Sequence, residues 1–225
     1  MQNQEWAEEL KRETDRDNYP QWPNETMLKV LFGSYLKKSF CLPDNANVLD
    51  VGCFFGNNLL PFAAKGANCF GVDIHEDIVD KAKAIFKNKG FDGNFSQGSN
   101  SSIPYPDGTF DLLISVNTIH YEPTREAVMD AISEFKRVLK PGGRFYISSV
   151  GPSHDIKKKA LKMGENLFEI RDWDFRNGQT FYFFETETEI LETFGESFQN
   201  VEVGEITEKL MQQTLGFYVV SGEKK

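Results

Sequence analysis

The sequence predicts an α/β fold in which a doubly wound sheet of seven strands, mostly parallel with an antiparallel last strand, has helices on both faces. Three stretches support this prediction. Residues 47–51 form a short apolar run that leads into Gly52 and Gly56 and then into a helical pattern. Residues 68–73 repeat the pattern of a strand that ends in an acid. Residues 112–117 are almost continuously apolar, as expected of a central strand that is covered on both faces.

The composition is that of a globular protein with no nucleic-acid or membrane partner. The chain has 225 residues and a net charge of −9, which argues against a nucleic-acid backbone as substrate. No signal peptide is apparent, and no apolar run approaches the ~18 residues of a membrane span. Cys41, Cys53 and Cys69 have no metal-ligand spacing, so we expect reduced, buried thiols, no metal site and a cytoplasmic location.

Residues 1–44 precede the sheet and are expected to be helical, which divides the chain into this segment and a domain over residues 45–225. A short first helix is expected over residues 5–13, and the two prolines that follow it exclude regular helix. Asn24 has the residue type of an N-cap, and the apolar pattern after it predicts a second helix through Phe40.

The loop after the first predicted strand has the residues of a ligand-binding turn. Glycine lets the backbone approach a ligand closely, and the free N–H groups that open the next helix face that ligand. A dinucleotide turn reads Gly-x-Gly-x-x-Gly, whereas Gly52 and Gly56 are four residues apart and follow Asp50. A carboxylate there repels a pyrophosphate but suits an ammonium group. An ordinary β-turn-α connection without a ligand is the alternative.

The remaining helices and strands follow from apolar periodicity and from turn residues. Thr124 to Lys140 keeps one face apolar and ends at Pro-Gly-Gly, which predicts a helix followed by a strand. In the segment 151–184, inserted after the fifth strand, Asn177-Gly178 predicts a hairpin. The other expected elements are a helix that ends at Gly90, a strand at 94–98, a fifth strand at 144–150, a helix at 155–167, a helix at 186–198 and strands at 201–206 and 217–221.

From Asp50 to Gly56 the chain resembles the class I S-adenosylmethionine (SAM)-dependent methyltransferases, whose motif reads roughly acid-x-Gly-x-Gly-x-Gly. Phe54 stands at the position of the middle glycine. Residues 98–111 resemble the family pattern Gly-Asp-x-x-x-Leu-Pro-Phe before Phe-Asp, and Leu-Lys-Pro-Gly-Gly at 139–143 is a third match. The resemblance covers about residues 45–150. It implies a Rossmann-like sheet, SAM as cofactor and S-adenosylhomocysteine (SAH) as product.

The resemblance also implies which residues bind the cofactor. In the family the glycine loop lies against the methionine part of SAM, and an acid after the second strand accepts the ribose hydroxyls, as Rossmann-type sites generally do. The acid that accepts the adenine amino group in relatives is replaced here by Ser99, with Asn100 beside it. The expected cofactor-binding residues are Asp50, Gly52, Cys53, Gly56, Asp73, Ile74, Ser99, Asn100 and Asn117.

The polar residues after the strand at 112–117 lie where open α/β sheets bind ligands, and in the family this loop lines the junction of SAM and substrate. His120 is the candidate catalytic base, with Glu122 as a second candidate and a hydrogen-bonded loop histidine as the structural alternative. Family members often carry a segment like 1–44 as a lid and use an insertion like 151–184 to select the substrate. The expected substrate-binding residues are Tyr19, Trp22, His120, Tyr121, Arg171 and Trp173.

Three classes of function remain at this point. The leading one is in-line SN2 transfer of a methyl group from SAM to a small-molecule acceptor. A non-catalytic SAM-fold binding protein is the second, because Phe54 and Ser99 depart from the family pattern. An NAD-type oxidoreductase is the third, and the glycine spacing beside Asp50 argues against it.

Overall fold

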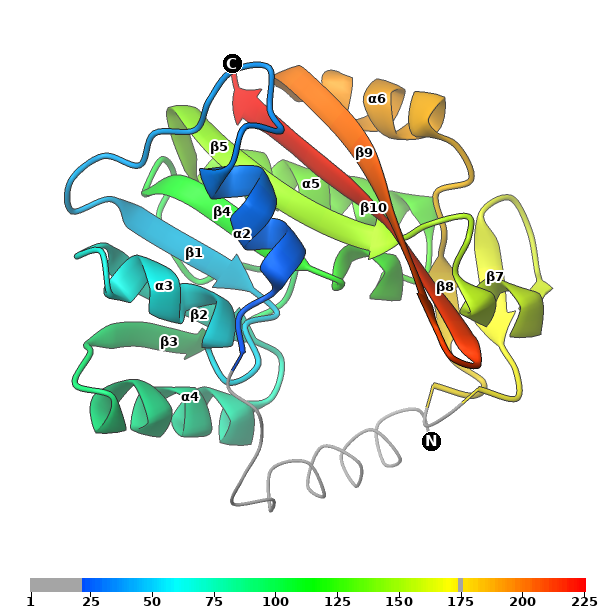
Figure 1. Cartoon of the computed structure of the whole chain (residues 1–225), viewed down its shortest axis with the longest axis horizontal. Helices are drawn as coiled ribbons and strands as arrows, with labels where there is room; N and C mark the ends of the chain where they lie inside the picture. Colours follow the sequence, from blue (N-terminus) through cyan, green and yellow to red (C-terminus); the bar gives the residue numbers. More distant parts are fainter. Residues whose placement is uncertain (1–21, 174–175) are drawn as a thin grey trace.

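Seven strands form the central sheet of the computed structural model, which describes residues 22–173 and 176–225 (Figure 1). Their order is β3-β2-β1-β4-β5-β10-β9; β10 runs antiparallel to both of its neighbours, β5 and β9, and the pairings among β1 to β5 are parallel. The predicted fold class is therefore confirmed. The strands are β1 (Asn47–Val51), β2 (Asn68–Asp73), β3 (Gly93–Gln97), β4 (Phe110–Val116), β5 (Leu139–Val150), β9 (Phe198–Leu210) and β10 (Gln213–Lys224).

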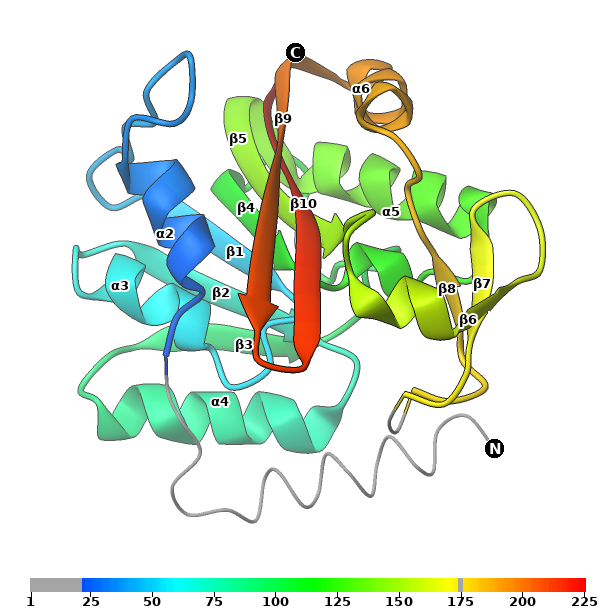
Figure 2. The ribbon, with the colours of Figure 1, turned by 45° about the vertical axis from the view of Figure 1, so that its right-hand side comes forward.

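Helices cover both faces of the sheet (Figure 2). Buried side chains of α2, α3 and α4 pack on one face, and those of α5 and α6 pack on the other. In β4 the side chains alternate between the two, since Leu112 and Ile114 join the first cluster and Leu113 joins the second. The helices are α2 (Glu25–Phe32), α3 (Leu60–Ala63), α4 (Glu76–Asn88), α5 (Arg125–Val138) and α6 (Glu187–Gly195), with short 3₁₀ turns η1 (Asn57–Leu59), η2 (Ile119–Tyr121) and η3 (Asp155–Lys159).

Side-chain caps fix where three of the helices begin. The side chain of Asn24 accepts a hydrogen bond from the backbone N–H of Met27, as expected of an N-cap. Thr124 and Thr186 cap α5 and α6 in the same way. These caps agree with the predicted starts of the three helices. None of the described helices has the length and the apolar character needed to cross a membrane.

The N-terminal segment differs from the prediction. Helix α2 ends at Phe32 rather than Phe40, because Gly33 takes an extended conformation (φ −93°, ψ −162°) and the chain continues without regular structure to β1. Cys41 in this stretch is exposed, so the expectation of a buried thiol is wrong there, whereas the other two cysteines are buried. The helix predicted over residues 5–13 lies outside the described residues.

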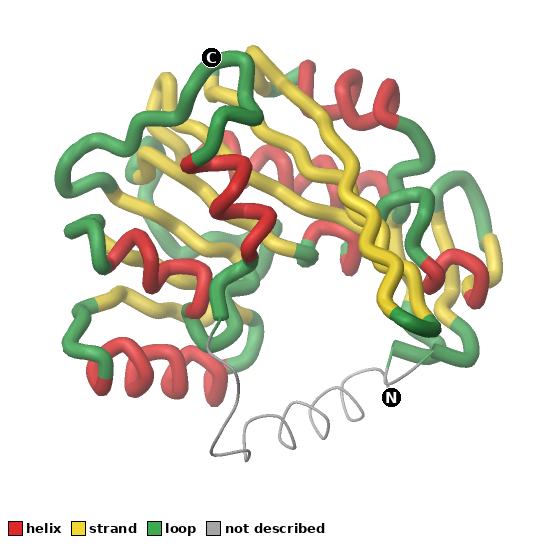
Figure 3. Tube along the Cα trace, viewed as in Figure 1, coloured by secondary structure: helices red, strands yellow, loops and turns green. Residues whose placement is uncertain are grey.

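The segment after β5 forms a second, three-stranded sheet where a helix over 155–167 was predicted. The turn η3 is followed by β6 (Ala160–Lys162), which pairs with β7 (Leu167–Ile170), and β7 pairs with β8 (Thr180–Tyr182), all antiparallel (Figure 3). The reason is long-range: Ile156 packs in a cluster of buried aromatic and aliphatic side chains from β7 and β8. A hairpin is present, since β7 pairs with β8, but Asn177-Gly178 does not form a tight turn between its strands: β7 ends at Ile170 and β8 begins at Thr180, so these two residues lie in a longer connection.

The C-terminal hairpin is longer than predicted. Strands β9 and β10 have 13 and 12 residues, and β5 ends at Val150, opposite Phe217 of β10. Residues 213–216 therefore pair with β9 alone, and this end of the hairpin projects past the end of β5 toward the second sheet (Figures 1 and 2). Strand β5 also begins earlier than predicted, at Leu139, which pairs with Phe110 of β4. The register between the two strands then shifts between Phe110 and Leu112.

Candidate functional site

A pocket of about 460 Å³ lies at the carboxyl ends of β1, β2 and β4. This is the edge at which open α/β sheets bind ligands. Residues at or after the ends of β1, β2, β3 and β4 form most of its wall, and Gln179 and Thr180, at the start of β8, contribute the rest. The residues that line this first pocket are Gly52, Phe54, Asp73, Ile74, His75, Gly98, Ser99, Asn100, Val116, Asn117, Thr118, Tyr121, Glu122, Pro123, Gln179 and Thr180.

Gly52 brings the loop after β1 into close contact with the loop after β4. It has φ of +72°, and its N–H donates to the carbonyl of Val72 at 2.8 Å. A Cβ atom added to Gly52 would lie less than 3.0 Å from Cγ2 of Thr118, closer than real Cβ atoms approach their neighbours. Any side chain at this position would therefore push the two loops apart. The floor of the first pocket depends on glycine at this position.

Asp73 holds the glycine loop from the end of β2. Its Oδ2 accepts a hydrogen bond from the N–H of Phe54, and its Oδ1 accepts one from the N–H of His75, both at 3.1 Å. Burial raises the pKa of this carboxyl, and the two N–H donors lower it by less. Each carboxylate oxygen has a further lone pair, so Asp73 can also accept two hydroxyl groups from a ligand in the pocket.

Phe54 takes the left-handed conformation (φ +47°) at the position where the family motif has glycine. Its ring lies 3.9 Å from that of Phe55, between centroids, and packs with Ile78 and Ile85 of α4. The side chain is thus anchored on the helix beside the loop, and the residue also borders the first pocket.

Asp50 is completely buried behind the loop. Neither carboxylate oxygen has a hydrogen-bond partner among the described residues. Burial raises its pKa to about 8, the nearby side chain of Asn58 opposes this rise in part, and the charge of Asp73 adds a smaller increase. Asp50 does not line the pocket, and the same is true of Cys53 and Gly56. The other six residues expected to bind the cofactor do line it.

Asn100 joins the loops after β3 and β4. Its Nδ2 donates to Oε1 of Glu122 at 2.8 Å, and its Oδ1 accepts from Oγ1 of Thr118 at 3.2 Å. Thr118 Oγ1 also lies in hydrogen-bond contact with Ser115 Oγ. Ser99 pairs with Ser102 through both backbone groups. These contacts fix the wall of the pocket opposite Asp73.

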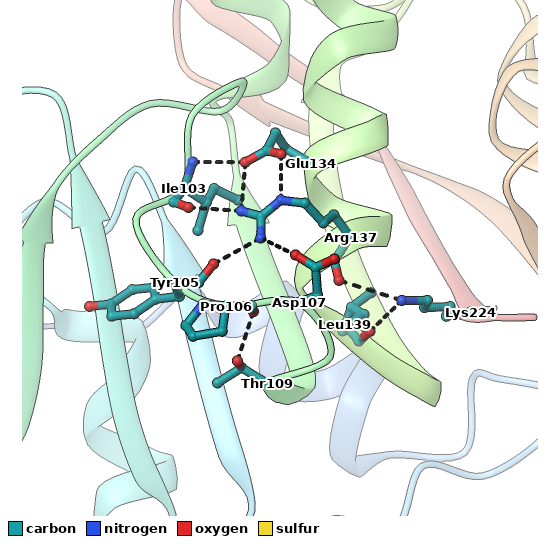
Figure 4. Close-up of polar contacts among 9 residues, drawn as sticks. All are labelled: Ile103, Tyr105, Pro106, Asp107, Thr109, Glu134, Arg137, Leu139 and Lys224. Atoms are coloured by element: carbon teal, nitrogen blue, oxygen red, sulfur yellow. Dashed lines mark hydrogen bonds and ion pairs between the residues drawn. The ribbon is translucent and has the colours of Figure 1, made fainter.

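Arg137 of α5 fastens the loop that follows β3 (Figure 4). Its guanidinium donates to the carbonyls of Ile103 and Tyr105, each at 2.9 Å, and to the carboxylate of Asp107 at 2.7 Å. Glu134 binds the same guanidinium and accepts from the N–H of Ile103 at 3.0 Å. One side chain therefore ties the loop that contains Ser99 and Asn100 to the underlying helix.

Replacing Arg137 by glutamine is expected to lower the free energy of unfolding by about 1.5–3 kcal/mol, because several charge-assisted hydrogen bonds are lost. Amide hydrogen exchange in residues 98–109 should become faster as the loop opens. Chemical denaturation and exchange mass spectrometry measure the two effects. Arg125→Gln is the matched control, since Arg125 is exposed on the same helix and makes one long contact, at 3.5 Å, with Tyr182. Equal effects of both variants would contradict the role of Arg137.

A second pocket of about 390 Å³ adjoins the first. It is bounded by the loop after β4, the end of β5, the second sheet and the projecting end of the β9–β10 hairpin. Asn117 and Tyr121 line both pockets, so they mark the junction. The residues that line the second pocket are Asn117, His120, Tyr121, Val150, His154, Ile156, Trp173, Arg176, Phe181, Gln213, Leu215 and Phe217.

Asn117 is held at the junction by β5. It has φ of +58°, a conformation that asparagine tolerates better than most residues. Its N–H donates to the carbonyl and to Oγ of Ser148, both at 3.1 Å, and its Oδ1 accepts from the same hydroxyl at 2.8 Å. Ser148 thus fixes both the backbone and the side chain of Asn117.

His120 and His154 are buried and neutral. Burial lowers the pKa of His120 to about 3 and that of His154 to about 4, and the charge of Arg176 is the next cause for both. The ring of His120 stacks on Tyr121 with centroids 4.8 Å apart. His154 Nδ1 accepts from the N–H of Ile156 at 3.1 Å, so the neutral ring carries its proton on Nε2.

The expected substrate-binding residues separate into two groups. His120, Tyr121 and Trp173 line the second pocket. Arg171 does not; it forms an ion pair with Glu169 at 2.8 Å. Trp22 is 78% exposed and lines neither pocket, and Tyr19 lies outside the described residues.

Several lining residues were not among those predicted. His154 follows the carboxyl end of β5. Because open α/β sheets bind ligands at the carboxyl ends of their strands, the reasoning that selects Asn117 also applies to His154. Gln179 and Gln213 had no such local signal. They reach the pockets through the second sheet and the C-terminal hairpin, whose positions depend on long-range packing.

Comparisons with known proteins agree with the geometry. Residues 49–147 match a family model described as a methyltransferase domain. The chain is 33% identical over 116 residues to an uncharacterized methyltransferase, YcgJ, of Bacillus subtilis, covering 51% of this chain and 44% of that protein. It is 31% identical over 136 residues to sterol 4-C-methyltransferase strm-1 of Caenorhabditis elegans, covering 60% of this chain and 40% of that protein. It is 30% identical over 115 residues to a fatty-acid O-methyltransferase of Mycolicibacterium smegmatis, covering 50% of this chain and 40% of that protein. These matches span less than half the length of the curated relatives.

Solved structures show the same fold. A SAM-dependent methyltransferase from Methanosarcina mazei superposes with a TM-score of 0.65 at 25% identity, covering 81% of this chain and 94% of that one. The PH0226 protein from Pyrococcus horikoshii gives the same TM-score and identity, with 89% of each chain covered. The YcgJ structure, at 18% identity and a TM-score of 0.61, covers 89% of this chain and 97% of its own and supports the fold alone.

Proposed function

We propose that this chain, which belongs to the class I SAM-dependent methyltransferase family, transfers a methyl group from SAM to a small-molecule acceptor. The observation that carries the proposal is the pair of adjoining pockets that share Asn117 and Tyr121. One pocket has the residues for a nucleoside cofactor, and the other has room for a second molecule. The names of the relatives mention a sterol and a fatty acid, which supports a small-molecule acceptor.

The residues of the first pocket fit SAM. Gly52 borders the pocket with its backbone alone, Asp73 has a further lone pair on each oxygen for the ribose hydroxyls, and Asn100 Oδ1 has a second lone pair for the adenine amino group. Asp50 lies just behind the loop and is protonated at neutral pH in the protein described, because burial raises its pKa to about 8; a cation bound at the methionine end would favour loss of this proton. When bound, SAM supplies a sulfonium whose methyl group is the electrophile.

The protein's task in this reaction is alignment. Holding two reactants in a near-attack arrangement can contribute about 7–11 kcal/mol. With SAM in the first pocket and an acceptor in the second, a lone pair of the acceptor would form the new bond to the methyl carbon, and the electron pair of the broken carbon–sulfur bond would stay on sulfur, giving SAH. Asn117, fixed by Ser148, and Tyr121 border the space in which these atoms meet.

His120 as catalytic base stays a prediction. Its neutral imidazole is able to accept a proton, but a pKa of about 3 makes it a weak base, since a general base works best when its pKa lies near the operating pH. We therefore favour an acceptor whose attacking atom carries a free lone pair at neutral pH.

Calorimetric titration of the protein with SAM, SAH and NAD tests the cofactor. We expect SAM and SAH to bind and NAD not to bind. Asp73→Ala is expected to weaken SAM binding at least tenfold, since the hydrogen bonds to the ribose are lost and two N–H donors of the loop are left unpaired. Asp92→Ala, at an exposed position outside the pocket, serves as the control.

The outcomes distinguish the candidates. An unchanged dissociation constant in Asp73→Ala, with a folded protein by circular dichroism, would reject the ribose role. Binding of NAD would favour the oxidoreductase. Binding of SAH without methylation of any member of a broad acceptor screen would favour a non-catalytic SAM-binding protein, an alternative that the aromatic side chain of Phe54 in the cofactor loop supports.

A further inference from the structure

We propose that the carboxylate of Glu122 accepts an N–H of the adenine amino group and thereby selects a 6-aminopurine cofactor over a 6-oxopurine one. The inference rests on the proposed function and deepens it, because it names a residue that determines which base the first pocket binds. It follows from the acids of this pocket, the contacts of Glu122 and the position of its partner Asn100.

The first pocket contains acids without a lysine or arginine to balance them. Among its described lining residues, Asp73 and Glu122 are the acids, and none is Lys or Arg. Such a wall suits a ligand that presents hydrogen-bond donors. Asp73 is assigned to the ribose hydroxyls, so the donor that meets Glu122 belongs to another part of the cofactor.

Glu122 has a carboxylate oxygen that is available to a ligand. Its Oε1 accepts a hydrogen bond from Nδ2 of Asn100 at 2.8 Å. Its Oε2 has no hydrogen-bond partner among the described residues and is not closed off from solvent. A carboxylate is a stronger acceptor than a hydroxyl or an amide oxygen, so Oε2 can form a strong hydrogen bond with an N–H group of a ligand.

The surroundings of Glu122 disfavour its negative charge. Burial raises the pKa of this carboxyl, the amide of Asn100 opposes the rise, and the nearby charge of Asp130 adds to it. Within residues 22–173 and 176–225, no Lys or Arg forms an ion pair with Glu122. A half-buried acid without a cation, at the wall of a ligand pocket, is typical of a group that serves the ligand.

The contacts of Asn100 indicate which part of the cofactor meets Glu122. Thr118 lies against Gly52 and donates to Asn100 Oδ1, and Asn100 in turn donates to Glu122. Thr118 and Asn100 thus stand between Glu122 and the glycine loop, where the methionine part is placed. Asn100 Oδ1 is assigned to one N–H of the adenine amino group. This group has a second N–H, and Glu122 Oε2 accepts it.

The position of Glu122 also favours a role toward the cofactor over that of a second candidate base. It lines the first pocket and not the second, where the acceptor is placed. A 6-oxopurine has a carbonyl oxygen where adenine has its amino group. That oxygen would face Glu122 Oε2 and Asn100 Oδ1, which are both acceptors, and a site built in this way rejects such a base strongly.

Calorimetric titration with SAH and with S-inosylhomocysteine, in which a carbonyl replaces the adenine amino group, tests this inference. We expect the parent protein to bind SAH at least a hundredfold more tightly than S-inosylhomocysteine. Glu122→Gln should lower this ratio at least tenfold, because the amide keeps an oxygen for Asn100 and offers an N–H to the carbonyl. Glu122→Asp should retain part of the preference. Glu126→Gln, at an exposed position of α5 outside the pocket, should leave it unchanged.

An unchanged ratio in Glu122→Gln would overturn the inference, since a residue that only positions Asn100 keeps that contact through the glutamine oxygen. Equal weakening of both ligands would also overturn it, because Glu122 would then meet a part that the two ligands share. Circular dichroism checks the fold of each variant. Should Glu122→Gln not fold, Glu122→Asp decides: a lowered ratio supports the inference, and an unchanged ratio overturns it.

The same titrations separate this inference from the proposed function. Binding of SAH and S-inosylhomocysteine with equal affinity by the parent protein would overturn the role of Glu122 and leave the SAM site standing. Binding of neither ligand by the parent protein would overturn the proposed function, and the inference with it.

Discussion

Asp50→Asn is expected to raise the free energy of unfolding at pH 8 by a few kcal/mol, an order-of-magnitude figure that follows from the linkage between pKa and stability. In the folded protein burial raises the pKa of Asp50 from 3.8 to about 8. Below pH ~4 the carboxyl is protonated in both the folded and the unfolded state, and it has no effect on stability. Between pH ~4 and ~8 the unfolded chain loses this proton and the folded protein keeps it. The parent protein therefore loses stability as pH rises through this window, and the variant does not.

Urea denaturation of both proteins at several pH values from 5 to 8 measures the effect. The difference in stability should grow with pH, with a slope of at most about 1.4 kcal/mol per pH unit. Asp92→Asn, at an exposed position, is the control for a general charge effect. A difference that does not change with pH would contradict the buried, unpaired state of Asp50. Weaker SAM binding in the more stable variant would indicate that this carboxylate is retained for its ligand.

Gly52→Ala is expected to lower the free energy of unfolding by about 2–5 kcal/mol and to weaken SAM binding at least tenfold. The left-handed conformation costs alanine about 1–2 kcal/mol, and overpacking adds about 1–3 kcal/mol. The overpacking arises because the new Cβ would lie less than 3.0 Å from Cγ2 of Thr118. The loop after β1 must then move away from the loop after β4, which widens the floor of the first pocket.

Two comparisons separate the causes. Gly66 has φ of +83°, and a Cβ added there would meet no atom within 4 Å, so Gly66→Ala should show the conformational cost alone and leave SAM binding unchanged. Thr118→Ser removes Cγ2 and keeps the hydroxyl that donates to Asn100. The double variant with Gly52→Ala should therefore be less destabilised than the sum of the single variants. Strict additivity would show that Thr118 is not the obstacle.

The sequence was sufficient to predict those elements whose structure is determined by interactions between residues close together in the chain. Strand β2 has the predicted bounds, because an apolar run between turn residues ends in Asp73. The caps at Asn24 and Thr124 begin their helices as predicted, since each side chain meets an N–H three residues ahead. Gly52 and Asp73 come together in the first pocket because parallel strands end at one edge of the sheet.

The prediction from sequence failed where contacts between residues distant in sequence determine the local structure. The stretch after Asp155 has helical residues, but Ala160 pairs with Ile170 of β7, and strand pairing of this kind is not visible in local propensity. The approach of Gln213 to the second pocket likewise depends on the length of the C-terminal hairpin. Asp50 was correctly expected at the end of the first strand, but its complete burial follows from packing of the loop above it.

The projecting end of the β9–β10 hairpin has a consequence for how specificity can change. Most of the first pocket comes from residues 52–123, within or close to the stretch that matches the methyltransferase domain, whereas much of the second comes from residues 150–217. The hairpin end is held by its own ladder and by contacts with residues 151–155: the N–H of Gly151 donates to the carbonyl of Gly216, Ser153 Oγ lies in hydrogen-bond contact with Thr207 Oγ1, and the N–H of Thr214 donates to Asp155. A graft of residues 207–215 from a relative, chosen to keep the contacts with residues 151–155, would exchange part of the wall of the second pocket while leaving the first pocket untouched, which makes this hairpin a natural unit for changing the second pocket alone.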